Sequence, residues 1–516
     1  MSTRGTFGRE HVALLTANEA AALDREARER HDVPARVLME NAGRSAALVV
    51  QRLFPSGRVI AVLGSGNNGG DALVLLRNLL AWGRDVAYLQ AGSKPPVPDL
   101  FHGFDIPRID YGDAVNAFAA AAVLVDGILG TGATGAPREP AAGVIRAMNA
   151  SGRPIVALDI PTGVDPTTGD VPGDVVDADV TLQFGWPKLG ALQQPGRGHC
   201  GRIVAVEIAF PPLQPEQAGA ALITPAWAVA RLPARPQDAH KNMVGRLFVL
   251  AGHPGMSGAA VIAGRSAVRA GVGYTWVASP EANRTILQLA VSEAIFVDRE
   301  DESALREAVS SADAVLAGPG IGTDAAAERA LDVVLDAFQG PCVLDADALN
   351  ILSQRDGALR ELARARPLLV TPHPGEMSRL TGASVADIQK DRLGAARAWV
   401  EDHGATLLLK GAPSIVASPD APVLMASTGS SDLASAGMGD MLSGTIGAFL
   451  AGGCTPRDAA GLGLFYGGRA SELAGRHRGL SPNDVSDALH AAFADPGPAA
   501  SPLDLPFVNF DQPPRW

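Results

Sequence analysis

The stretch RVIAVLGSGNNGGDALV (residues 58–74) decides the fold of the first half of this 516-residue chain. A short, nearly all-apolar run passes through a glycine-rich loop into a run with helical character. Apolar runs of this kind suit parallel strands that helices cover on both faces. The stretch therefore predicts an α/β fold, and the unpaired amides where its helix begins could bind an anion such as phosphate.

The same alternation recurs along the chain and is interrupted once. A stretch containing Pro211, Pro212, Pro215 and Gly219 predicts a linker between two domains, because 516 residues are too many for one hydrophobic core. We expect domains at 1–216 and 220–516, with the last twenty or so residues as a loosely ordered tail. The further strands are expected at 85–90, 121–129, 154–160, 179–184 and 202–210, and then at 246–252, 274–279, 313–318, 342–347, 368–372, 406–411 and 414–418.

Composition excludes several classes of protein. Lys and Arg number 43 against 55 Asp and Glu, and the net charge of −12 has the wrong sign for a nucleic-acid partner. The three cysteines lie far apart, which predicts neither a disulfide framework nor a zinc site and fits a cytoplasmic location. No long apolar run or signal peptide stands out, so we expect no membrane span.

The glycine-rich loop allows more than one interpretation. Gly64, Gly66 and Gly69 match the GxGxxG fingerprint of dinucleotide sites, with Asp85 near the distance expected for a ribose contact. A tight strand-to-helix turn would also use these glycines. Such a turn needs neither the two carboxamides nor the carboxylate of the segment 67–71, however, so the loop favours a ligand site.

Three more oxygen-rich loops follow strands of the first half, at 126–132, 159–165 and 187–190. Since the carboxyl ends of parallel strands line one crevice, these loops should converge. Their Asp, Asn, Thr and carbonyl oxygens suit a monovalent cation better than zinc or iron. The alternative is that Asp126 and Asp159 cap helices and that Thr162 only makes a turn.

Five motifs of the first half, taken in order, resemble the NAD(P)H-hydrate epimerases: LMENAG (38–43), GSGNNGGDALV (64–74), VDGILGTG (125–132), ALDIPTGVD (157–165) and PKLG (187–190). The resemblance implies a Rossmann-like three-layer domain that interconverts the R and S forms of hydrated NADH or NADPH at C6. It also implies a potassium ion held by Asn68, Asp126 and Thr162. The residues implied to hold the hydrate are Asn67, Asn68, Gly69, Gly70, Asp71, Gly130, Thr131, Gly132, Ala133, Thr134, Gly135, Ala136 and Asp159.

Epimerisation requires a group that exchanges protons with the substrate. Asp159 is the candidate, because a carboxylate in a ligand-filled crevice is easily shifted towards a neutral pKa. Lys188 is the alternative, either as the acid/base itself or as a partner for phosphate.

In the second half, the motif ASAGMGDMLSG (434–444) carries the strongest chemical signal. Gly437 and Gly439 free backbone amides at the start of a helix, where Asp440 also lies, and this predicts an anion hole beside a base. The alternative makes Asp440 a plain helix cap. His373 stands in a stiff loop between two prolines, and with Glu376 it indicates either a ligand pocket or a structural histidine.

This arrangement resembles the ribokinase-like superfamily and, within it, the ADP-dependent NAD(P)H-hydrate dehydratases. The supporting motifs are AHKNMVGRLFVLAGHPGMSGAAVIA (239–263), LDADALN (344–350), TPHPGEMSRLTG (371–382), LLLKGAPSIVASP (407–419) and the motif at 434–444. The resemblance implies a C-terminal ribokinase-like α/β domain that uses ADP with Mg²⁺. The implied hydrate residues are Ala259 or Ala260, Gly320, His373 and Asp440, and the implied nucleotide residues are Lys410, Gly411, Ala412, Pro413, Ser414 and Gly439.

Together the two resemblances predict a fused repair enzyme whose small-molecule substrates are the NADH and NADPH hydrates and ADP. We expect a homo-oligomer with no nucleic-acid or membrane partner. The alternative is a ribokinase-like kinase for a small alcohol, fused to a Rossmann-like module that only senses a nucleotide.

Overall fold

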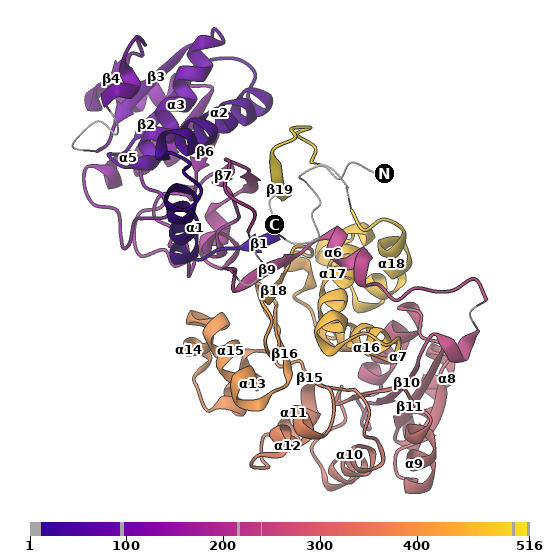
Figure 1. Ribbon diagram of the computed structural model, residues 1–516. Coiled ribbons are helices and arrows are strands. Elements are labelled where there is room, and N and C mark those ends of the chain that lie inside the picture. The colour runs from indigo at the N-terminus through magenta and orange to yellow at the C-terminus, as the bar shows by residue number, and fades with distance from the viewer. Residues whose placement is uncertain (1–11, 93–97, 214–216, 239, 498–500, 513–516) are drawn as a thin grey trace. The chain divides into compact units, whose positions relative to one another are not determined.

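The computed structural model describes residues 12–92, 98–213, 217–238, 240–497 and 501–512 (Figure 1). The chain divides into two compact units. The first comprises Met1–Ala221 together with Ala499–Arg515, and the second is formed by Leu222–Pro498. Of the expected linker, residues 214–216 lie outside the described part of the chain.

The first unit is built on a sheet with the strand order β19-β8-β7-β6-β5-β2-β3-β4. All neighbouring pairs except β19 with β8 are parallel. The strands are β2 (Val59–Leu63), β3 (Val86–Gln90), β4 (Arg108–Ile109), β5 (Val123–Gly127), β6 (Ile155–Leu158), β7 (Val180–Phe184), β8 (Arg202–Val206) and β19 (Val508–Gln512), and a short strand β1 (Val12–Leu14) precedes the first helix.

Helices cover both faces of this sheet, as the alternation of side chains along β2 shows. Val59, Ala61 and Leu63 pack with α2 (Ala35–Leu53) and α3 (Asn67–Ala81) on one face. Ile60 and Val62 pack with α4 (Ala114–Ala120) and α5 (Ala141–Ala150) on the other. Because successive strand residues point to opposite faces, an all-apolar strand has to be covered twice. The predicted three-layer Rossmann-like domain is confirmed, and α1 (Ala17–Glu29) precedes it.

The expectation of a loosely ordered C-terminal tail is wrong for the described residues 501–512. β19 pairs antiparallel with β8, and Val508 and Phe510 are buried in the core of the first unit. The Asp511 carboxylate accepts two hydrogen bonds from the Arg202 guanidinium, both of 2.7 Å. The chain's end therefore completes the first domain, although 220–516 was expected to form the second. This strand could not be predicted from the sequence, because its apolar run is short and the region around it is rich in proline and alanine.

The second unit contains a larger sheet, in which the strands β18-β17-β16-β15-β14-β13-β10-β11-β12 follow one another in this order and β12 lies at an edge. The strands from β16 to β12 pair in parallel, whereas β16, β17 and β18 pair antiparallel. Their bounds are β10 (Arg246–Leu250), β11 (Tyr274–Ser279), β12 (Ile295–Asp298), β13 (Ala314–Ala317), β14 (Cys342–Leu344), β15 (Leu368–Val370), β16 (Thr406–Leu409), β17 (Ile415–Ala417) and β18 (Val423–Ala426), while β9 (Ala220–Ile223) spans the point where the units divide.

Two glycine-rich helices, α16 (Met438–Ala451) and α17 (Pro456–Ala474), pack on this sheet and on each other. Figure 1 shows them beside α7 (Ser257–Arg269) and α18 (Pro482–Ala494). Gly444 makes the contact of α16 with α7 possible, because a Cβ there would lie 2.2 Å from the carbonyl oxygen of Ala263. The remaining helices are α6 (Pro225–Arg231), α8 (Arg284–Ala290), α9 (Glu302–Ser310), α10 (Ala325–Ala337), α11 (Ala346–Leu352), α12 (Ala358–Ala365), α13 (Pro374–Thr381), α14 (Val385–Lys390) and α15 (Arg392–His403).

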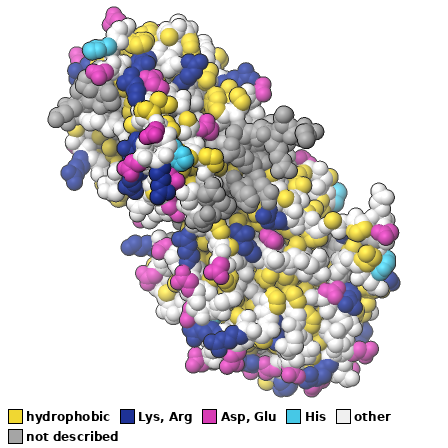
Figure 2. All heavy atoms as spheres, viewed as in Figure 1, with side chains coloured by type: hydrophobic (Ala, Val, Ile, Leu, Met, Phe, Trp, Pro, Cys, Tyr) yellow, Lys and Arg dark blue, Asp and Glu magenta, His cyan; other side chains and the backbone are white. Residues whose placement is uncertain are grey.

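The surface carries both signs of charge. On the face shown in Figure 2, basic and acidic side chains are interspersed. Among the described residues, no helix is both long enough and apolar enough to cross a membrane.

Candidate functional site

In the first unit, the glycine-rich loop brings the start of α3 against the end of β5. Gly64 follows β2, and a Cβ on it would lie 1.8 Å from the carbonyl oxygen of Ile128. The loop can therefore approach its neighbour only with glycine at this position. The adjacent helix begins with Asn67, its N-cap is Gly66, and no side chain caps it. Its amides are thus available to a ligand.

Asn68 has a buried oxygen without a partner. Its side-chain nitrogen donates to the carbonyl oxygens of Leu129 (2.9 Å) and Leu158 (3.2 Å), which leaves Oδ1 buried and unbonded. Desolvating an amide oxygen without a partner costs free energy, so this atom points to an absent ligand.

Thr162 and, through it, Asp126 lie next to the same residue, Leu129, because the Thr162 hydroxyl contacts both the N–H and the carbonyl oxygen of Leu129. Asp126 is fully buried and accepts hydrogen bonds from the backbone N–H of Ile128 and from the N–H and hydroxyl of Thr162, at 2.8–3.1 Å. Burial raises the pKa of Asp126 to about 6, although these hydrogen bonds lower it. Neither Asp126 nor Asp159 caps a helix. The helix after Asp126 has Pro140 as its N-cap, and the next helical turn after Asp159, Leu189–Leu192, has Lys188. The structure therefore brings together the three residues expected to hold potassium.

Asp159 forms the centre of the neighbouring site. Its Oδ1 lies 2.9 Å from Nζ of Lys188, and its Oδ2 accepts the N–H of Thr131 at 3.0 Å. The residue has a φ of 63°, in the left-handed region that costs a non-glycine residue about 1 kcal/mol or more. Such backbone strain is typical of functional positions, where the surrounding structure holds the residue in place.

The expected shift of Asp159 towards a neutral pKa is wrong. Burial does raise its pKa, but Lys188 and the bonds to Thr131 outweigh burial and hold the pKa below its ordinary value. The neighbouring carboxylate whose pKa is raised is that of Asp71. Burial raises its pKa well above the usual range, and the charges of Asp159 and Asp24 raise it further. The crevice thus pairs an ionised carboxylate with one that favours its proton.

The loop 130–136, which was expected to hold the hydrate, and a cavity of about 230 Å³ adjoin this site. Gly130 lies against Asp159 and Asn68, and Gly130, Ala133 and Gly135 line the cavity together with residues 160–165. The expected ribose contact of Asp85 is wrong, because Asp85 precedes β3 and pairs with Arg58 (3.1 Å) at the opposite end of the strands.

In the second unit, Asp440 is the third residue of α16 and is not its cap. The N-cap is Gly437, at a φ of 85°, and no side chain caps this helix. Burial and the charges of Asp345 and Asp347 together raise the pKa of Asp440 to about 7, although the charge of Lys410 lowers it. Asp440 is therefore a carboxylate tuned to exchange a proton near neutral pH, next to free helix amides.

Lys410 connects the charged side chains around Asp440. Its Nζ lies 2.7 Å from Oδ1 of Asp345 and 3.9 Å from Oε2 of Glu376. The other oxygen of Asp345 accepts the hydroxyl of Ser443, on the same helix as Asp440. Burial lowers the pKa of Lys410, but the two carboxylates raise it more, so the ammonium stays charged. Sequence reasoning missed Asp345, although it lies in the quoted LDADALN motif directly after a buried strand.

The other expected residues lie at the same carboxyl edge of the sheet. His373 is the N-cap of α13, and its Nδ1 accepts the N–H of Gly375 at 2.9 Å, while its side chain is half exposed. Gly320, with a φ of 57°, lies so close to α7 that a Cβ would be 2.8 Å from that of Ala259. Gly439 faces Nζ of Lys410. Ala260 is fully buried in α7, whereas Ala412, Pro413 and Ser414 follow Lys410 in a loop with a cis Ala412–Pro413 bond.

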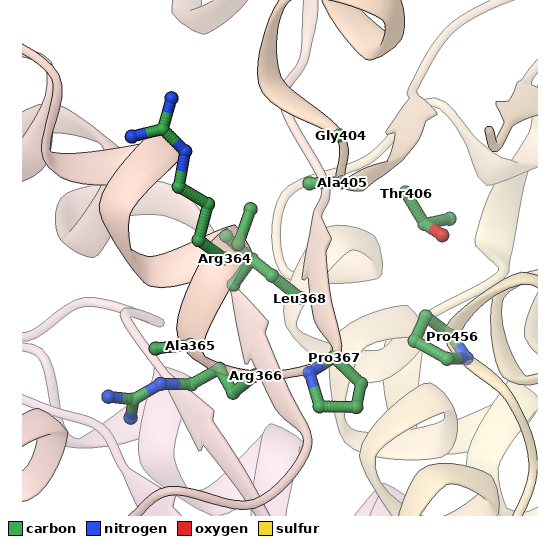
Figure 3. A pocket seen from close by; sticks show the side chains of 10 residues that line it. Arg364, Ala365, Arg366, Pro367, Leu368, Gly404, Ala405, Thr406 and Pro456 are labelled. Atoms are coloured by element: carbon green, nitrogen blue, oxygen red, sulfur yellow. The ribbon is translucent and has the colours of Figure 1, made fainter.

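A cavity of about 390 Å³ lies at the other edge of this sheet, opposite the carboxyl ends of its parallel strands (Figure 3). It is lined by Leu368 and Thr406, the first residues of β15 and β16, together with Arg364 and Pro456. Because β15 and β16 are parallel, this cavity lies at the amino ends of the strands and apart from the candidate site.

Both units thus belong to a two-domain α/β enzyme whose candidate site residues gather at the carboxyl ends of the parallel strands of each sheet. Family models match both: residues 35–190 match the YjeF-related protein N-terminus, and residues 247–491 match NAD(P)H-hydrate dehydratase.

Curated relatives span nearly the whole chain. The bifunctional NAD(P)H-hydrate repair enzyme Nnr of Moorella thermoacetica is 35% identical over 505 residues, covering 92% of this chain and 95% of that protein. The enzyme of the same name from Escherichia coli is 35% identical over 467 residues, covering 88% of each. An ADP/ATP-dependent NAD(P)H-hydrate dehydratase of Bacillus subtilis, co-crystallised with ATP/Mg²⁺, is 30% identical, with a TM-score of 0.46, covering 52% of this chain and 96% of that one. The chain belongs to the family of bifunctional NAD(P)H-hydrate repair enzymes.

Proposed function

We propose that the first unit interconverts the R and S forms of hydrated NADH and NADPH, and that the second unit dehydrates the S form at the expense of ADP. Family membership supports the overall reaction. The observation that carries the proposal is the carboxylate and lysine pair at the ligand edge of each sheet, Asp159 with Lys188 and Asp440 beside Lys410.

In the first unit, Asp159 acts as the proton-exchanging group. Since Lys188 keeps it ionised, it starts as a base, and the ammonium at 2.9 Å can donate a proton in turn. The hydrate lies against the helix amides at 67–71 and against the loop 130–136. The contacts of Gly130 and Thr131 with Asp159 support this assignment.

Potassium fits the set formed by Asn68, Asp126 and Thr162. The side chains of Asn68 and Thr162 both contact the carbonyl oxygen of Leu129, and Thr162 also donates to Asp126. The three side chains supply hard oxygen atoms, among them the unbonded oxygen of Asn68, with one negative charge. When bound, the ion would neutralise the buried Asp126 and hold the loop at 129–131 in place.

In the second unit, Asp440 accepts the proton of the C6 hydroxyl as that oxygen takes the β-phosphoryl group of ADP. The products of this transfer are AMP and a phosphate ester. Phosphate then leaves with the C6–O electron pair while C5 loses a proton, which restores the 5,6 double bond. The amides of residues 437–440 stabilise the charge on the transferred group.

The nucleotide lies along the segment 410–414 and Gly439, and Ala259 or Ala260, Gly320 and His373 hold the hydrate. Mg²⁺ would arrive with the nucleotide, because no group of three His, Cys, Asp or Glu side chains in the described residues could hold a metal alone. Protein-bound Mg²⁺ commonly uses one or two carboxylates plus substrate phosphates. A homo-oligomeric state and a cytoplasmic location stay predictions.

Chromatography of an R and S hydrate mixture tests the proposal. With ADP, the protein should consume S directly and R only through S, and without ADP it should only equilibrate the two. If small hydroxymethyl heterocycles give a stable phosphorylated product while the hydrates are untouched, the second unit is a small-alcohol kinase instead.

A further inference from the structure

Arg392 is a buried arginine at the first position of α15 that donates mainly to backbone carbonyl groups, while its Nε has no hydrogen-bond partner. Its Nη2 donates to the carbonyl oxygens of Leu409 (3.2 Å), Lys410 (3.0 Å) and Pro413 (3.1 Å). Nη1 donates to the side chain of Gln389. Among the described residues, no carboxylate forms an ion pair with its guanidinium, and the residue as a whole is 5% exposed. Burial accordingly lowers the pKa of Arg392 to about 10.

A buried charge with no counter-charge is costly, so its position calls for an explanation. The three carbonyl groups all belong to the end of β16 and the loop 410–414, the segment assigned to the nucleotide. Gly411 makes this approach possible, because a Cβ there would lie 2.8 Å from the guanidinium. The guanidinium therefore links the start of that loop, through the carbonyl groups of Leu409 and Lys410, to its end, through that of Pro413.

The direction of the carbonyl groups determines the direction of the amides. In a planar trans peptide the C=O and the following N–H point in opposite directions. When the carbonyl groups of Lys410 and Pro413 point at Arg392, the N–H groups of Gly411 and Ser414 point away from it. The Gly411 N–H donates to the Ser414 hydroxyl at 3.2 Å within the loop. Arg392 thus binds the acceptors of the loop on one side, while the Ser414 N–H is directed to the other side, where it can donate to an anionic ligand.

We propose that Arg392 is a positioning residue that holds the loop 410–414 in the conformation that binds the diphosphate of an adenine nucleotide. The inference rests on the proposed function of this loop. It predicts an effect on nucleotide affinity without any contact between Arg392 and the nucleotide.

A second buried arginine offers a matched control. Arg299 is 4% exposed and donates to the carbonyl oxygens of Gly252 (3.2 Å) and Ile321 (2.8 Å), next to Gly320 at the proposed hydrate end of the site. The same substitution at this position removes a similar buried cation from a different loop.

The experiment compares Arg392→Gln, Arg392→Lys and Arg299→Gln in the full chain. ADP binding is measured by calorimetry without hydrate, and steady-state dehydration is measured separately. Arg392→Gln should weaken ADP binding about ten- to hundred-fold and raise KM for ADP while kcat at saturating ADP changes only a few-fold. Arg392→Lys keeps the charge and should show a smaller loss, whereas Arg299→Gln should leave ADP affinity within about two-fold and raise KM for the hydrate.

Three results would overturn the proposal: folded Arg392→Gln that binds ADP as the parent does, equal losses of ADP affinity in the Arg392 and Arg299 variants, or a loss of kcat and thermal stability with KM for ADP unchanged. If Arg392→Gln fails to fold, the comparison of Arg392→Lys with the parent decides in the same way. A parent protein that binds no ADP would instead refute the proposed function of the loop.

Discussion

Replacing Asp511 by alanine should destabilise the first unit and leave the second unchanged. Both oxygens of Asp511 accept hydrogen bonds from Arg202, and the side chains are 2% and 22% exposed. Removing one partner of a fully buried ion pair typically costs about 3–5 kcal/mol. Because Arg202 can still reach some water, we expect the lower end, about 3 kcal/mol. For a domain of this size that corresponds to about 6–12 °C in melting temperature.

Hydrogen exchange followed by mass spectrometry measures each unit separately in the intact chain. Amides of β7 and β8 should lose about 3 kcal/mol of protection, whereas those of β13 and β14 should not change. Asp85→Ala is the matched control, since its ion pair with Arg58 is exposed and should contribute at most about 1 kcal/mol. If Asp511→Ala changes the protection of β8 no more than Asp85→Ala does, β19 does not pair with β8 in solution.

The remaining predictions concern the two reactions. Asp440→Asn should lower dehydration by about 10²- to 10⁴-fold with ADP affinity nearly unchanged, and a rate within a few-fold of the parent would make Asp440 only structural. Because Asp440 must be ionised to act as a base and its pKa is about 7, kcat/KM for dehydration should fall as the pH drops below about 7. Lys410→Met should move this acid limb to higher pH and Asp347→Asn to lower pH, and limbs that move the other way would contradict the assignment. Asp126→Ala should weaken epimerisation and its dependence on potassium without affecting dehydration, and equal epimerase rates in potassium and in a bulky organic cation would refute the metal site.

Much of the fold could be predicted because it depends on local patterns. All-apolar runs such as 59–63 can only be strands covered on both faces, and Thr455 followed by Pro456 marks the start of α17. The loops that carry Asp126, Asp159, Lys410 and Asp440 could be placed at one edge of each sheet for the same reason, since parallel strands bring their carboxyl ends together.

The charge states of these residues could not be predicted in the same way. Asp71 and Asp159 are both carboxylates in one crevice, yet Lys188 lowers the pKa of one and burial raises that of the other. A pKa depends on distances of a few ångströms between residues far apart in the chain, and only the folded structure sets these distances.

The sequence alone determined the α/β character of both halves, the loops that carry the candidate site residues and the family resemblance, because strand period, glycine loops and motif order are local properties. Only the tertiary structure decided that β19 completes the first domain, that Asp345 pairs with Lys410 and that Arg392 donates to the carbonyl groups of the loop 410–414. In each of these cases the partner is distant in sequence, 18 to 309 residues away. Such pairs form because a strand edge, a buried charge or a buried carbonyl group must find a partner, and the chain's three-dimensional path determines which partner is within reach.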